Sequence, residues 1–108
     1  MSNTSHIARR SFLAIQPDGQ SIRVTVQIGL PYEVASEEWA VPVSMEGLHD
    51  RLGDLHGLDS WQVVQLAFEF IVQLLEHFVR GGGSLCWLDT HDRFDPADLL
   101  PGQGDRAG

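Results

Sequence analysis

The sequence contains no lysine, and all seven of its basic residues are arginines. This usage is typical of a GC-rich genome, so we expect a bacterial source. A single cysteine excludes an internal disulfide, so the fold does not depend on an oxidising compartment. Residues 1–10 have no apolar core of a signal peptide, and polar residues interrupt the longest apolar-rich stretch, 63–79. We therefore expect a cytoplasmic protein.

Basic residues of either kind are scarce beside acidic ones. Fifteen acids against seven bases give a formal net charge of −8. A phosphate backbone or an anionic membrane surface would repel such a chain, so we expect neither nucleic acid nor membrane as a partner. Seven of the acids fall in residues 31–60, which contain a single Arg. The middle of the chain is therefore its acidic part.

The residue patterns of known metal and catalytic sites are also missing. The five histidines do not pair at the spacing that holds zinc, and we expect no metal and no cofactor. Cys86 lies in an apolar strand, where a thiol behaves as a small hydrophobic side chain, so we do not expect it to act as a nucleophile. The candidate polar residues that remain are His49, His56, Asp89 and His91. We interpret them first as surface and loop residues, because the Asp-rich stretch around His91 is typical of a solvated segment.

At 108 residues the chain is long enough for one hydrophobic core and too short for two. Residues 7–15 and 21–28 flank Pro17-Asp18-Gly19, which predicts a β-hairpin. After a loop over 29–37, the alternation in 39–45 predicts a third strand. Pro42 within that strand cannot donate a ladder hydrogen bond, so the strand should lie at an edge or carry a bulge there.

One long helix is predicted over residues 60–80. Asp59 can cap its start, Gln62 can reach back, and Arg80 followed by glycines ends it. The segment 46–58 has room for at most one or two helical turns. Residues 84–88 predict a short final strand, and residues 91–108 a flexible tail after a single domain of residues 1–90. The sequence therefore predicts an α+β two-layer sandwich in the order β-β-β-α-β, with an antiparallel sheet of about four strands and the helix on one face.

The apolar face of the predicted helix is wider than one sheet usually covers. One of its flanks contains the candidate interaction residues Trp61, Val64, Phe68 and Val72. Two interpretations remain open for the uncovered part. The segment 46–58 can fold over it, or a second copy of the chain can cover it in a homodimer. Trp61, in the first turn, is the best candidate for an exposed interface residue.

Several short motifs resemble those of a bacterial family of small domains of unknown function. The resemblance covers residues 7 to about 88. It rests on Ile7-Ala8-Arg9-Arg10, Pro17-Asp18-Gly19, Glu38-Trp39-Ala40-Val41-Pro42-Val43, Gly57-Leu58-Asp59-Ser60-Trp61-Gln62 and Leu85-Cys86-Trp87-Leu88. The chain departs from the family pattern at Val41, where the family has Cys, and in the larger residues of its helix. The resemblance implies the same strand and helix order and no activity.

Two hypotheses for function follow. The first is an acidic, non-catalytic interaction or assembly module whose partner is a basic protein or a second copy of the chain; a neutraliser of a basic partner is a narrower form of it. The second is an enzyme or small-ligand-binding domain whose site is assembled from distant residues such as His49, Asp54, His56 and Asp89. A flat apolar patch bordered by acids would favour the first, and a deep pocket with converging His and Asp side chains the second.

Overall fold

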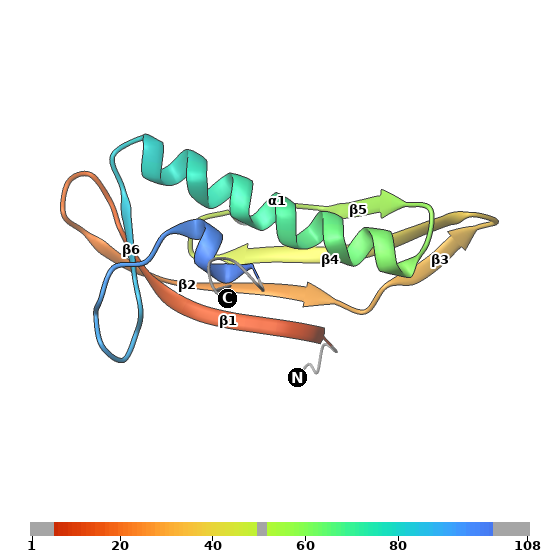
Figure 1. Ribbon diagram of the computed structural model, residues 1–108, viewed down its shortest axis with the longest axis horizontal. Helices are drawn as coiled ribbons and strands as arrows, with labels where there is room; N and C mark the ends of the chain where they lie inside the picture. Colours follow the sequence, from red (N-terminus) through yellow and green to blue (C-terminus); the bar gives the residue numbers. More distant parts are fainter. Residues whose placement is uncertain (1–5, 50–51, 101–108) are drawn as a thin grey trace, which may run out of the picture.

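The computed structural model describes residues 6–49 and 52–100 (Figure 1). Six strands and one α-helix form a curled antiparallel sheet with the helix on one face, which confirms the predicted α+β class. The elements are β1 (His6–Ile15), β2 (Ser21–Gly29), β3 (Tyr32–Ala35), β4 (Glu38–Glu46), β5 (Asp54–Gly57), α1 (Ser60–Arg80), β6 (Ser84–Cys86) and the 3₁₀ helix η1 (Pro96–Leu99). The strand order is β3-β4-β2-β1-β6, and β5 pairs with β4.

The predicted hairpin is the pair β1–β2. Gly19 has a φ of 93°, a left-handed conformation that glycine adopts without steric cost. The N–H of Gly19 donates to the carbonyl of Gln16 over 2.8 Å, which closes the turn. From the turn, the two strands stay paired as far as His6 and Gly29, so this hairpin is the long central pair of the sheet.

Pro42 does not place β4 at an edge, because β4 has neighbours on both sides. On one side it pairs first with β3 and then with β2, and Pro42 lies at the change of neighbour. Between the pairs Ile28↔Val43 and Tyr32↔Ala40 the β2–β3 side advances by four residues and β4 by three, so one residue is extra. The missing N–H of Pro42 falls at this irregularity, which is the bulge alternative of the sequence analysis. The expected loop over 29–37 contains β3.

The segment 46–58 was predicted to have room for at most one or two helical turns, and the residues of this segment that the structure describes form none. Its ordered element is the strand β5, which pairs with β4 from Trp39↔Gly57 to Pro42↔Asp54. Gly47 and Gly53 both have positive φ, which interrupts a helix, and β4 offers a free edge that fixes an extended chain. Leu48, Leu52 and Leu55, whose spacing in the sequence is helical, pack against the core. β5 also contacts α1, so this segment covers part of the wide apolar face of the helix.

The helix begins and ends where its caps predicted. The Asp59 carboxylate accepts from the N–H of Gln62 over 2.8 Å, and the Gln62 side chain accepts from the N–H of Leu58 over 2.7 Å. An Asp N-cap stabilises a helix by about 1 kcal/mol. At the other end the N–H groups of Gly82 and Gly83 donate to the last carbonyls, and Gly82 takes a φ of 107°.

Part of the segment 91–100, which was predicted to belong to a flexible tail, packs against the domain. Phe94 is 7% exposed, stacks on Trp87 with 3.9 Å between ring centroids, and meets Phe12 edge to face at 5.3 Å. The N–H of Phe94 donates to the carbonyl of Leu85 over 3.1 Å, which fixes the chain beside β6. The packed part of the chain therefore continues past residue 90, and residues 101–108 lie outside the described residues.

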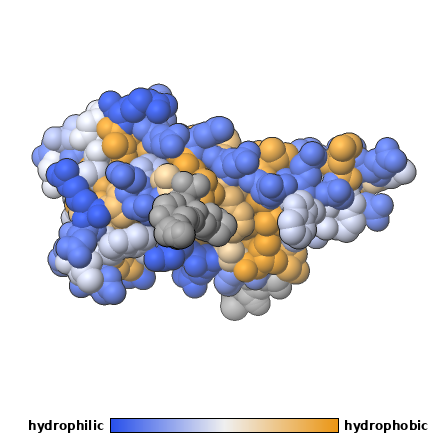
Figure 2. Space-filling view, viewed as in Figure 1, coloured by the Kyte–Doolittle hydropathy of each residue, from blue (hydrophilic) through white to orange (hydrophobic). Residues whose placement is uncertain are grey.

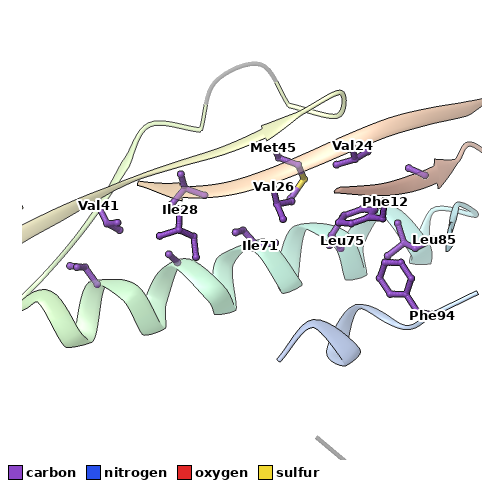
Figure 3. Packing of buried hydrophobic residues seen from close by; sticks show 14 residues of the cluster. Phe12, Val24, Val26, Ile28, Val41, Met45, Ile71, Leu75, Leu85 and Phe94 are labelled. Atoms are coloured by element: carbon purple, nitrogen blue, oxygen red, sulfur yellow. The ribbon is translucent and has the colours of Figure 1, made fainter. Parts of the chain in front are cut away.

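One hydrophobic core lies between the sheet and α1 (Figure 3). Its buried members come from every layer: Phe12, Ala14, Val24, Val26, Ile28, Val41, Val43, Met45, Val63, Ala67, Ile71, Leu75, Leu85 and Phe94. Alternate residues of β2 and β4 point inward, as the period of two predicted. α1 lies over β4, β5 and β2, while the C-terminal segment covers β6 and the adjoining half of β1.

By length and composition alone, α1 is also apolar enough to cross a membrane. Core helices of globular proteins pass the same test. In this fold Val63, Ala67, Ile71 and Leu75 are buried against the sheet, and the opposite side is a polar stripe that includes Glu69 and His77. A helix with one buried and one polar side is typical of a two-layer domain.

Candidate functional site

Most of the exposed large apolar residues gather at one end of the molecule. We call residues 30–40 and 54–61 the acidic arm: β3, the first part of β4, β5 and the start of α1. The pairing of β4 with both β3 and β5 brings these two segments together. In Figure 1 the arm is the narrow end of the molecule, on the right.

Large apolar side chains protrude from this arm. Trp61, in the first turn of α1, is 77% exposed, and Leu58, just before the helix, is 62% exposed. Three further residues of the arm are also exposed: Leu30, Tyr32 and Val34. A lone exposed apolar residue needs no explanation, but a group of five on one projection is typical of a binding surface.

Negative charge surrounds these apolar residues. The acids of the arm are Glu33, Glu37, Glu38, Asp54 and Asp59. Against them, the only basic side chain within the arm is His56, whose Nδ1 lies 3.0 Å from a Glu38 carboxylate oxygen. Asp59 is engaged as the helix cap. The remaining carboxylates give the arm a negative potential toward solvent.

Tyr32 and Asp54 bridge the outer side of the arm across β4. The Tyr32 hydroxyl donates to an Asp54 carboxylate oxygen. This hydrogen bond raises the pKa of Tyr32, with smaller contributions in the same direction from desolvation and from the Asp54 charge. The bond links β3 to β5, which do not pair with each other. It therefore ties the three strands of the arm together.

The predicted interaction residues do not form one flat patch. Trp61 is exposed, Val64 and Phe68 are half-buried, and Val72 is buried. Phe68 and Val72 form the helix wall of a cavity beside β1. Of these four residues, only Trp61 therefore belongs to the acidic arm.

The predicted polar residues are not brought together either. His56 lies on β5, while His49 follows β4 and forms an isolated bridge with Met45. Asp89 and His91 lie in the loop after β6, which Figure 1 shows well apart from β5. In that loop the Asp89 carboxylate accepts from the N–H of Thr90, and His91 adopts a φ of 66°. Within residues 6–49 and 52–100 no group of three His, Cys, Asp or Glu side chains is arranged to hold a metal ion.

Two features of the surface were missed by sequence reasoning. Leu58 looked like part of a short covering segment, and its exposure follows from its place between β5 and the helix cap. Arg9 and Arg10 line the cavity beside β1, together with Leu99 of η1. Two adjacent arginines in one strand are unusual in an acidic chain without lysine, and this pattern could have pointed to the cavity beside β1.

Comparison with known proteins places the chain in a family without assigning an activity. No curated protein and no solved structure shows significant similarity to it. A family model described as a domain of unknown function matches residues 8–96. The match spans the strand–helix core and extends through Phe94. The chain therefore belongs to the family described as "Domain of unknown function (DUF6968)".

Proposed function

We propose that this domain is a protein-interaction module that binds a basic segment of another protein through the acidic arm. The observation that carries the proposal is the exposure of Trp61 at 77%, beside Leu58, on a projection rich in carboxylates. Trp is enriched among residues that dominate binding energy, because its ring buries a large apolar area at a low entropic cost.

Charge selects the kind of partner. Carboxylates around an apolar centre attract Lys- and Arg-rich surfaces, accelerate their association and repel acidic ones. The apolar centre, Trp61 and Leu58, would then supply most of the affinity, and the surrounding carboxylates would supply the selectivity. The alternative of an enzyme gains little support from the geometry: Asp54 and His56 share β5, but His49 follows β4 and Asp89 lies in the loop after β6.

The partner can be sought by photo-crosslinking inside the cell of origin. A photoreactive phenylalanine analogue replaces Trp61, and the matched control carries the analogue at His77, which is exposed near the other end of α1. We expect position 61, and not position 77, to cross-link a protein with a basic segment. Equal cross-linking from both positions, or an acidic partner, would contradict the proposal.

Affinity for the purified partner then measures the two parts of the surface. Trp61→Ala should weaken binding by roughly 30-fold or more, the loss typical of a central anchor. Glu33→Gln with Glu37→Gln should slow association and reduce its dependence on salt, because these variants remove charge without changing shape. His77→Ala is the control and should leave the affinity unchanged. Calorimetry and stopped-flow fluorescence supply the two readouts.

A further inference from the structure

Within residues 6–49 and 52–100, no strand pairs with the outer edge of β1 over its first half. β2 pairs with β1 from His6 to Ile15, but β6 pairs only with Leu13, Ala14 and Ile15. Among the described residues, no backbone hydrogen bond joins residues 6–12 to anything except β2. A free strand edge presents unpaired N–H and C=O groups and can accept a further strand.

A cavity of about 180 Å³ lies beside this free edge. Ala8 and Ile28 line it from the sheet, Phe68 and Val72 from α1, and Leu99 from η1. It lies between α1, the first half of β1 and η1, which itself contacts α1. Figure 2 shows hydrophobic surface between α1 and the N-terminal end of β1.

The size of the cavity favours a peptide over a small ligand. Pockets that enclose small molecules usually measure about 300–1,000 Å³. A cavity of about 180 Å³ holds one or two apolar side chains instead. Strand addition combines such a pocket with backbone hydrogen bonds along a sheet edge.

The charge at this edge selects an acidic occupant. Arg9 and Arg10 both line the cavity and both are exposed, and Arg10 lies over the Trp87 ring, 4.7 Å from its centroid. Pairing with β1 of a second copy would bring four arginines onto one short stretch, which like-charge repulsion opposes. Asp or Glu side chains of a partner would instead form charge-assisted hydrogen bonds with the guanidinium groups.

We propose that the free edge of β1 binds an extended segment of another protein in which apolar residues alternate with Asp or Glu. The segment adds a strand next to residues 6–12 and places apolar side chains in the cavity beside Val72. This site is separate from the acidic arm and takes a partner of the opposite charge.

A displayed library of random linear peptides, selected on the full chain, tests the proposal. We expect one class of selected peptides to alternate apolar and acidic residues. Amide hydrogen exchange, followed by NMR, should show that such a peptide protects amides within residues 6–12. Failure to select this class, or protection confined to another part of the chain, would overturn the proposal.

Variants separate this site from the arm. Arg9→Gln with Arg10→Gln should weaken the acidic peptide roughly tenfold or more, because two charged donors are lost. Ala8→Leu fills the cavity and should weaken it as well, with an unchanged circular dichroism spectrum as the check on folding. Arg23→Gln, an exposed arginine of β2, is the matched control.

Trp61→Ala should leave the affinity for the acidic peptide unchanged, so failure at one site is distinguishable from failure at the other. Basic peptides whose affinity falls in Trp61→Ala test the acidic arm only, and say nothing about the β1 edge. Acidic peptides that bind Arg9→Gln/Arg10→Gln as tightly as the natural sequence would sink the strand-addition proposal, whatever the arm does.

Discussion

Tyr32 is the only tyrosine in the chain, so its ionisation can be followed without interference from another phenol. Its hydroxyl donates to Asp54, and this bond raises the pKa of Tyr32 above the ordinary value of 10.0. Ultraviolet difference spectroscopy should therefore show tyrosinate forming at a higher pH than in a free peptide. In Asp54→Asn the hydrogen-bonded carboxylate charge is gone, and the midpoint should fall toward 10.0.

The sign of the linked stability follows from the direction of the shift. Because the folded state favours the neutral phenol, the contribution is fully present below the unfolded pKa and is lost as pH rises through the folded one. Unfolding experiments at alkaline pH should therefore show a larger loss of stability in the natural sequence than in Tyr32→Phe. Identical titration midpoints in the natural sequence and Asp54→Asn would contradict the bond.

The same residues show where local sequence reasoning stops. Asp59 and Gln62 are three positions apart, so their reciprocal capping is a local pattern that the sequence alone predicts. Tyr32 and Asp54 are 22 positions apart, and they meet only because β4 pairs with both β3 and β5. No spacing rule connects them. The same strand pairing brings the exposed apolar residues of the arm together, so the sequence did not predict this group. Trp61 is the exception, because its place in the first helical turn predicted its exposure.

At the scale of elements, the sequence predicted correctly those helices and strands whose ends are marked by residues within the same segment. The helix has caps at both ends and a long apolar period, and the first hairpin has a Pro-Asp-Gly turn. β5 carries neither signal. Its four residues become a strand because the edge of β4 is available, which is a tertiary effect. The C-terminal segment was missed for a related reason, since its composition is Asp-rich and only Phe94 and Pro96 within residues 91–100 are buried.

Phe94 should therefore be essential to the stability of the domain. Phe94→Ala removes a ring that contacts both Phe12 and Trp87, and such truncations in a core cost about 3–5 kcal/mol. Urea unfolding followed by tryptophan fluorescence measures the loss. Asp92→Ala, an exposed change in the same segment, should stay within about 0.5 kcal/mol of the natural sequence. A loss in Phe94→Ala no larger than in Asp92→Ala would mean that this segment does not pack on the core.

At the scale of the whole molecule, the two proposed binding surfaces have opposite charge preferences. The arm concentrates carboxylates around Trp61, whereas the β1 edge concentrates arginines beside an apolar cavity. Two copies could in principle pair arm to edge. Such a head-to-tail contact does not close on itself, so it would produce mixed larger assemblies and not a defined dimer. The net charge of −8 opposes that association at low salt.

We therefore predict a monomer in solution, with a mass of 12.0 kDa at every concentration in a light-scattering series. The wide helix face was the argument for a homodimer, and β5 covers part of it while Phe68 and Val72 wall a cavity too small for a second helix. Like charges on β1 oppose edge-to-edge pairing, and added salt tests this reason directly, because screening would promote any such dimer. A mass of about twice the chain that persists on dilution would contradict the prediction. Trp61→Ala and Arg9→Gln/Arg10→Gln would then tell which surface a second copy occupies.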